Sequence, residues 1–78
     1  MKSIKIHLSS IEDVKQFVNA ASLADFEVDL ISGRYIIDAK SIMGIFSLDL
    51  SKDIDLRAYC DDEAKLAAFF KQIEKFTV

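Results

Sequence analysis

The chain has 78 residues, 51% of them hydrophobic, and a net charge of −3, which together predict one packed domain over residues 1–78. The scattered lysines and arginines argue against a nucleic-acid partner, which would favour a basic stripe, and no apolar run approaches the roughly 18 residues that span a bilayer. The single cysteine, Cys60, can form no internal disulfide, no cluster of cysteines and histidines indicates a metal site, and no signal peptide is evident, so we expect a cytoplasmic protein without a cofactor.

The first half of the chain predicts a strand, a helix and a β-hairpin. In residues 4–8 apolar side chains alternate with polar ones, which is the period of a strand with one buried face. Apolar residues at helical spacing predict a helix over 11–22, and its start fits either of two capping boxes. Residues 26–30 and 35–38 alternate again around the turn signal Ser32-Gly33, so they predict a hairpin. The helical stripe consists of Ile11, Val14, Phe17, Val18 and Ala21, and the capping boxes pair Ser9 with Glu12 or Ser10 with Asp13.

A short helix is predicted to begin after Ser41, whose hydroxyl can accept a hydrogen bond from an unpaired N–H of the first turn. Gly44 costs about 1 kcal/mol relative to alanine inside a helix, so we expect it to let another backbone come close. Ile45 and Leu48 supply an inward pair. Three more large apolar residues lie on adjoining faces of this helix, which cannot bury every side: Ile42, Met43 and Phe46.

The last third of the chain predicts a strand and a final helix. After a polar connection over 48–53, residues 54–58 alternate as a fourth strand. Asp61, Asp62 and Glu63 come at the positive end of the following helix, which favours acidic groups electrostatically. That helix continues to near the end of the sequence with one apolar face, formed by Leu66, Phe69, Phe70, Ile73 and Phe76.

The predicted element order is therefore strand, helix, two strands, short helix, strand and helix. Alternation in the strands leaves one face of the sheet exposed to water, as antiparallel sheets allow. Helices on the other face would give an α+β fold, an open-faced two-layer sandwich. The pattern alone also permits a ferredoxin-like arrangement.

The consecutive residues Lys40-Ser41-Ile42-Met43-Gly44, taken with the element order and the length, resemble the HPr phosphocarriers of the bacterial sugar phosphotransferase system. The likeness covers nearly the whole chain and includes Ala21-Ser22, Val28, Leu30 and Ser47-Leu48. It implies an HPr-like fold, in which a four-stranded antiparallel sheet of order 1-4-2-3 is covered by three helices. It also implies protein partners of the phosphotransferase and catabolite-regulation type.

In the HPr family a phospho-accepting histidine begins the first helix and is followed by an arginine and a proline. Counted without gaps from Ser41, the matching positions in this chain are Ser10, Glu12 and Asp13. A phosphorylated imidazole needs a nucleophilic ring nitrogen and cationic donors around the phosphoryl oxygens. A serine without a base is a poor nucleophile and the two acids would repel a phosphoryl group. We therefore expect no catalytic residues, no ordinary phosphotransfer and no enzymatic activity.

The resemblance also suggests two roles for the short helix. Ser41 matches the serine that a dedicated ATP-dependent kinase phosphorylates in HPr proteins of many Gram-positive bacteria. A helix N-terminus suits a phosphate because its N–H groups and its dipole favour an anion, so Ser41 is either a regulatory phosphorylation site or only a helix cap. The family positions matching Ile42, Met43 and Phe46 form an exposed apolar surface that binds enzyme I, the serine kinase and a catabolite repressor, and we predict a partner surface here.

Three hypotheses of function remain open. The first is a non-catalytic, HPr-like protein-binding module related to the phosphotransferase system and regulated at Ser41. The second is a phosphoryl carrier whose acceptor has moved to His7 or Ser10. The third is a structural relic that binds no component of that system. His7 alternates outward from its apolar neighbours, so we expect it to face solvent on the side of the sheet away from the helices, with no orienting partner.

Overall fold

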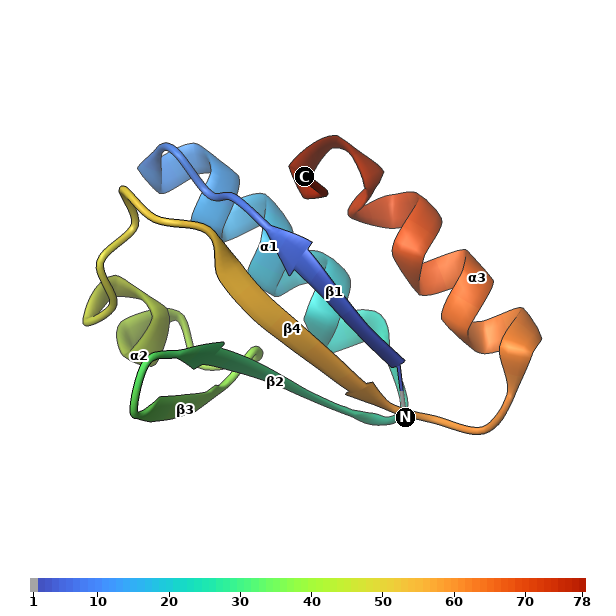
Figure 1. Cartoon of the computed structure of the whole chain (residues 1–78). Helices are drawn as coiled ribbons and strands as arrows, with labels where there is room; N and C mark the ends of the chain where they lie inside the picture. Colours follow the sequence, from blue (N-terminus) through green and yellow to red (C-terminus); the bar gives the residue numbers. More distant parts are fainter. Residues whose placement is uncertain (1) are drawn as a thin grey trace.

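The computed structural model describes residues 2–78 and contains a four-stranded sheet with helices on one face (Figure 1). The strands are antiparallel and lie in the order β1-β4-β2-β3. The predicted α+β, HPr-like open-faced sandwich of order 1-4-2-3 is therefore confirmed. The elements are β1 Lys2–Ile6, α1 Ile11–Leu23, β2 Glu27–Ser32, β3 Tyr35–Asp38, α2 Ile42–Phe46, β4 Ile54–Tyr59, α3 Glu63–Gln72 and the 3-10 turn η1 Glu74–Phe76.

Strand β4 explains why one face of the sheet is covered and the other is not. Its residues alternate between buried and exposed along the whole strand, as the period of two requires. Leu56 is fully buried and lies between Ile4 of β1 and Leu30 of β2, so the inner face is apolar across three strands. Arg57, one residue later, faces water. The helices pack on the inner face because its side chains are apolar, and covering them removes apolar surface from water.

Helix α1 contributes the largest of the fully buried side chains. Phe17 is fully buried and meets Phe76 of η1 edge to face, with ring centroids 6.3 Å apart. Phe69 of α3 makes a second edge-to-face pair with Phe26, at 5.7 Å. Full burial of a side chain of this size contributes about 1.5–3 kcal/mol, so these pairs help to hold α1 against η1 and α3 against the segment before β2.

The hairpin between β2 and β3 forms where the sequence predicts it. Ser32 pairs with Tyr35 across a two-residue loop, and Gly33 in that loop has a φ of +59°. A residue with a side chain rarely adopts this left-handed conformation, which is why glycine occupies the turn.

The ends of the chain depart from the sequence prediction. The first strand covers residues 2–6 rather than 4–8, and its outer edge from Lys5 to His7 is paired with the C-terminal segment. His7 N–H donates to the Phe76 carbonyl at 2.8 Å, and Val78 N–H donates to the Lys5 carbonyl at 3.1 Å. The last helix ends at residue 72 and tightens into η1, and Phe70, expected in the core, is only partly buried.

Candidate functional site

Helix α2 is short and begins at Ser41, as predicted. The Ser41 hydroxyl accepts a hydrogen bond from Gly44 N–H at 3.2 Å, and its carbonyl accepts the first helical bond from Ile45 N–H at 3.1 Å. The preceding turn is held by Asp38, whose carboxylate accepts from Lys40 N–H at 2.9 Å. Residue types that cap and turn the chain therefore place Ser41 at the exposed start of α2.

The side chains of α2 divide between the core and the solvent. Ile45 and Leu48 are buried, which confirms the predicted inward pair. Met43 is 76% exposed and Phe46 is 38% exposed, so two large apolar groups stand at the surface of the isolated chain. Ile42 is only partly exposed because it also packs against the core. The predicted exposure of Met43 and Phe46 is thus confirmed, whereas their role in binding a partner stays a prediction.

Gly44 allows a close approach, but of a side chain and not of the expected backbone. A Cβ atom at this position would lie 2.6 Å from Cγ2 of Ile37 in β3 and 3.1 Å from the Ser41 hydroxyl oxygen. Carbon atoms pack comfortably at about 3.5–4.0 Å. The absence of a side chain at Gly44 is therefore what lets α2 lie directly on β3.

The start of α1 uses Ser10 as its cap. The Ser10 hydroxyl accepts a hydrogen bond from Asp13 N–H at 3.1 Å, which is one of the two bonds of the predicted Ser10–Asp13 capping box. The Asp13 carboxylate accepts from Ser9, through its N–H at 3.1 Å and its hydroxyl at 2.9 Å. These bonds favour the charged form and lower the pKa of Asp13 from its usual value of 3.8. The Ser10 hydroxyl is thus engaged as the helix cap, and the carboxylate of Asp13 is the basic group beside it.

Ile11 was expected on the buried stripe of α1, and that expectation is wrong, because it is 65% exposed. Gln16 contacts Lys75, and Ala20 lines a groove against α3, so this flank of α1 faces α3. At 3.6 residues per turn Ile11 lies on the opposite flank, the one toward α2. Figure 1 shows α2 and α3 on opposite sides of α1. Ile11 is thus a third exposed large apolar side chain, on the flank of α1 toward α2, and we call Ile11, Met43 and Phe46 the α2 surface.

Spacing within the helix did not reveal the exposure of Ile11. Residues three apart share a helix face, so spacing groups Ile11 with the buried Val14. Glu12, by contrast, accepts a hydrogen bond from Gln16 at 3.4 Å and so leans away from α2. The acidic group at this helix start is thus displaced from Met43 and Phe46.

His7 has an orienting partner, contrary to the sequence prediction. Its Nδ1 lies 3.1 Å from the Asp53 carboxylate oxygen, and both side chains are about half exposed. The register explains the contact: Ile6 pairs with Ile54, so the residues just beyond the two strands meet. A neutral imidazole that donates through Nδ1 keeps an unprotonated, nucleophilic Nε2.

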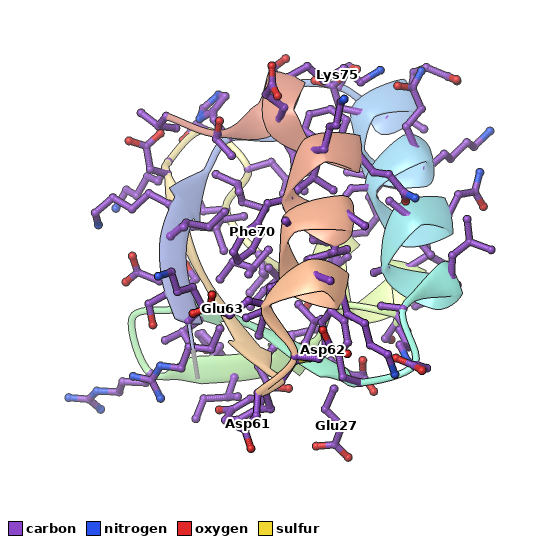
Figure 2. All side chains as sticks on the ribbon, turned by 90° about the vertical axis from the view of Figure 1, so that its right-hand side faces the viewer. Glu27, Asp61, Asp62, Glu63, Phe70 and Lys75 are labelled. Atoms are coloured by element: carbon purple, nitrogen blue, oxygen red, sulfur yellow. The ribbon has the colours of Figure 1, made fainter. Side chains whose placement is uncertain are left out.

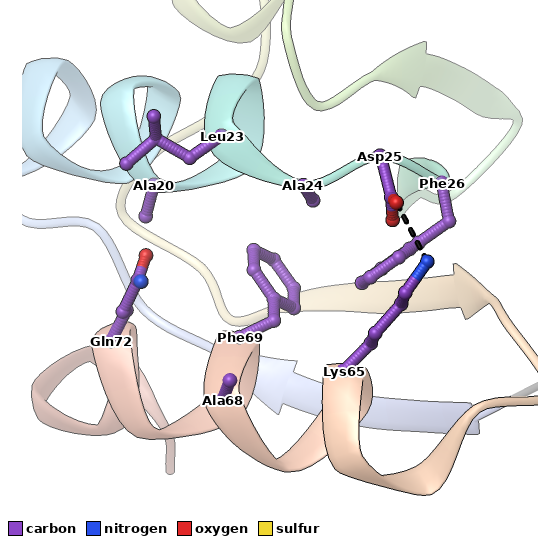
Figure 3. A pocket seen from close by; sticks show the side chains of 9 residues that line it. All are labelled: Ala20, Leu23, Ala24, Asp25, Phe26, Lys65, Ala68, Phe69 and Gln72. Atoms are coloured by element: carbon purple, nitrogen blue, oxygen red, sulfur yellow. Dashed lines mark hydrogen bonds and ion pairs between the residues drawn. The ribbon is translucent and has the colours of Figure 1, made fainter.

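A groove of about 230 Å³ lies between α1 and α3 (Figure 3). Its apolar lining includes Phe26 and Phe69, and an ion pair joins Lys65 to Asp25 at its mouth at 2.7 Å. The hydrogen bond between Lys65 and Asp25 lowers the pKa of Asp25 and raises that of Lys65, and the attraction between their charges adds to both shifts. These two charged groups satisfy one another, and the remaining polar side chain that lines the groove is the amide of Gln72.

Residues 2–78 contain no group of three His, Cys, Asp or Glu side chains placed to hold a metal ion. No helix in the described part of the chain is long and apolar enough to cross a membrane. The features that remain are the α2 surface beside Ser41 and the pair of His7 with Asp53.

No family model and no curated protein sequence matches this chain. Solved structures do match it. The crystal structure of HPr-C-His from Thermoanaerobacter tengcongensis superposes with a TM-score of 0.76 at 29% sequence identity, covering 96% of this chain and 93% of that one. The solved structures that resemble this chain are HPr phosphocarrier proteins. A phosphocarrier protein HPr from Bacillus anthracis str. Ames superposes with a TM-score of 0.65 at 22% identity, covering 91% of this chain and 94% of that one, which supports the fold alone.

Proposed function

We propose that this chain is a non-catalytic, HPr-like protein-binding module related to the bacterial sugar phosphotransferase system. Its partners would be proteins of the phosphotransferase or catabolite-regulation type, and they would dock on the α2 surface. The observation that carries this proposal is the exposure of Met43 and Phe46 beside Ser41. Large apolar side chains clustered at a surface are typical of the centre of a protein–protein interface.

Ser41 is the proposed regulatory site on this surface. Phosphorylation would add about −1.5 to −2 charges at the first turn of α2, where Gly44 N–H already points at the serine oxygen. The backbone donors favour an anion at this place, so the fold should tolerate the modification. The added charge would lie next to Met43, where arginines of a partner could bind it.

The proposal holds that ordinary phosphotransfer is lost. Ser10 occupies the position of the family's acceptor histidine, and its hydroxyl is engaged as a helix cap. Glu12 and Asp13 replace the neighbouring arginine and proline, and the bonds that lower the pKa of Asp13 keep it charged. A phosphoryl group approaching this helix start would meet negative charge instead of a cationic donor.

Binding to three purified proteins tests the docking surface: enzyme I, an HPr serine kinase and a catabolite repressor. We expect at least one to bind, with a dissociation constant about tenfold or more higher for Met43→Ala and Phe46→Ala. Ile36→Ala is the matched control, since Ile36 is an apolar residue on β3 whose exposure lies between those of Phe46 and Met43. Binding by none of the three would favour a structural relic, and equal loss in the control would place the interface elsewhere.

The regulatory site is tested with the serine kinase and ATP. One phosphate should be incorporated, and it should disappear in Ser41→Ala. Ser47→Ala is the control, because Ser47 is an exposed serine at the other end of the same helix. Incorporation that survives in Ser41→Ala, or no incorporation at all, leaves Ser41 as a helix cap only.

A second function, phosphoryl transfer by a relocated acceptor, is favoured by the contact between His7 and Asp53. The carboxylate would hold the ring so that Nε2 attacks the phosphoryl group and then carries it. Incubation with enzyme I and phosphoenolpyruvate would in that case place acid-labile phosphate on the chain. The label should vanish in His7→Ala and fall in Asp53→Asn. Unlabelled wild-type protein would rule this function out.

A further inference from the structure

The face of the sheet opposite the helices carries one apolar pair among charged residues. Residues that pair directly across antiparallel strands direct their side chains to the same face. Ile31 of β2 pairs with Ile36 of β3 on one side and with Asp55 of β4 on the other. Asp55 also pairs with Lys5 of β1. Because the neighbouring residues along β4 are buried under the helices, this row of side chains lies on the open face of the sheet.

The apolar end of this row is exposed to solvent. Ile36 is 64% exposed and Ile31 is partly exposed. Single apolar residues are common on protein surfaces, but these two lie directly opposite one another and so form one apolar area. Within residues 2–78 the helices lie on the other face of the sheet (Figure 1). The isoleucine pair is therefore available to a partner.

Opposite charges stand on either side of the isoleucines along β3. Asp38 follows Ile36 by two residues and therefore shares its face. Arg34 precedes Ile36 by two residues and lies in the hairpin turn. Both charged side chains are exposed. The hairpin is thus positive at its turn and negative at its other end, with the isoleucines between.

Strand β4 carries the two charges in the reverse order. Asp53, just before the strand, is level with the hairpin turn, because Asp55 pairs with Ile31 two residues before that turn. Arg57 lies on the far side of the row, level with Asp38. At each end of this face a positive side chain on one strand therefore accompanies a negative one on the other.

The other charged side chains on this face of the strands are Lys5, Asp55, Asp29 and Glu27. Lys5 and Asp55 bind each other at 3.0 Å, so together they add no net charge. Asp29 lies beside Asp38. Glu27 lies two residues farther from the isoleucines, and Figure 2 shows it directed away from the helices. Both of these acids add to the negative end of the hairpin, so they preserve the order of charges along it.

We propose that two copies of this chain associate through their open sheet faces. The two-fold axis lies between the two sheets and crosses the strands along the row of Ile31 and Ile36. It reverses the direction of every strand, so each strand faces the same strand of the other copy. The isoleucines of both copies pack together at the centre, and Asp38 of each copy approaches Arg34 of the other.

The same axis matches the charges of β4 and β1. Arg57 of each copy approaches Asp53 of the other, a carboxylate that His7 contacts within its own copy. Lys5 and Asp55 face their own counterparts, and each can bind the opposite charge across the axis as it does within the copy. Sheets packed face to face lie about 10 Å apart with their strands nearly aligned, a distance that these long charged side chains can bridge.

A second copy fits this face better than an unrelated protein would. Rotation about the axis supplies the opposite charge at both ends of β3 and β4, whereas another partner would need to reproduce that order. The apolar part of the face is confined to the isoleucines, so we expect a dissociation constant on the order of 100 micromolar. The α2 surface lies on the other side of the sheet and stays accessible, so this proposal and the proposed function can fail independently.

Sedimentation equilibrium over micromolar to millimolar concentrations tests the proposal. Wild-type protein should pass from monomer to dimer, and Ile36→Thr should raise the dissociation constant about tenfold or more, because symmetry removes an isoleucine from both halves. Threonine is β-branched and suits a strand. Tyr35→Thr is the matched control and should leave the dissociation constant unchanged. Tyr35 is 67% exposed and, as the adjacent residue of β3, faces the other way.

Charge reversal gives an independent measurement. In Arg34→Asp both ends of the hairpin are acidic and in Asp38→Arg both are basic, so each variant alone should dimerise about tenfold more weakly than the wild type. An equimolar mixture of the two variants should associate again, because each end of one hairpin then meets the opposite charge on the other. Circular dichroism verifies that each variant is folded, since Asp38 also accepts from Lys40 N–H.

Three results would overturn the proposal. The first is wild-type protein that stays monomeric at all concentrations. The second is a dimer that Ile36→Thr leaves unchanged or that Tyr35→Thr weakens to the same extent. The third is a mixture of the two charge variants that associates no more strongly than either variant alone.

Discussion

Replacing Gly44 by alanine tests the account of how α2 packs on β3. Alanine normally stabilises a helix by about 1 kcal/mol relative to glycine, so helix propensity alone predicts a more stable protein. The structure predicts the opposite. The new Cβ would lie 2.6 Å from Ile37 Cγ2, about 1 Å inside a comfortable carbon–carbon distance.

The clash cannot be relieved cheaply, because the atom involved is the branch of a β-branched side chain. Moving Cγ2 of Ile37 requires either an unfavourable χ1 angle or a shift of β3 against α2. Overpacking of this kind costs about 1–3 kcal/mol, which exceeds the gain in helix propensity. We expect Gly44→Ala to lose about 1 kcal/mol in the free energy of unfolding and about 4–8 °C in Tm.

Urea denaturation followed by circular dichroism measures the change, with the m-value as a check that the unfolded surface is the same. The decisive comparison is with Ile37→Leu, since leucine has no carbon at the Cγ2 position. In that background Gly44→Ala should become neutral or stabilising, which corresponds to a coupling energy of about 2 kcal/mol. A Gly44→Ala variant as stable as the wild type, with no coupling to Ile37, would refute the packing argument.

Three further predictions concern single side chains. Ser41→Ala should lower the free energy of unfolding by about 1 kcal/mol and Ser41→Asp by much less, since aspartate also caps a helix; equal losses in urea denaturation would argue against the cap. Ile45→Ala should cost about 2–5 kcal/mol and Met43→Ala less than about 0.5 kcal/mol, because only the first is buried; similar costs would contradict the orientation of α2. The lowered pKa of Asp13 means that its stabilising bonds to Ser9 are fully present above pH 3.8 and are lost as the pH falls through the lower folded value. Asp13→Asn should therefore be less stable than the wild type at neutral pH and equally stable at the most acidic pH, which unfolding curves at several pH values would test.

Local patterns in the sequence were sufficient for most of the fold. The alternation of β4, the glycine of the hairpin turn and the serine before α2 each depend on residues within one element. Such features follow from backbone geometry and from the hydrogen-bonding capacity of side chains, and both can be inferred from residue types and their spacing. The exposure of Met43 and Phe46 was predictable for the same reason, because Ile45 and Leu48 already filled the inward positions.

The features that the sequence did not disclose depend on contacts between distant segments. Asp53 reaches His7 only through the register of β1 with β4, and Val78 pairs with Lys5 at the opposite end of the chain. Phe70 has the spacing of a core residue within α3. Because α3 lies at the margin of the sheet, Phe70 is only partly buried. The spacing of a residue within its helix predicts which face of the helix its side chain lies on. It does not predict whether another helix or strand packs against that face.

Among residues 2–78 the buried positions are filled entirely by apolar side chains, and no buried side-chain polar atom lacks a hydrogen-bond partner. Such a core requires apolar side chains at the inward positions and a suitable total side-chain volume. It does not require a particular apolar residue at each position, so many combinations of aliphatic and aromatic residues can fill it. Sequences can then diverge at most interior positions while the backbone keeps its course. This explains how a chain without a matching family model superposes on an HPr structure with a TM-score of 0.76. In this protein the likeness to HPr structures is carried by the path of the backbone more than by the identity of the residues.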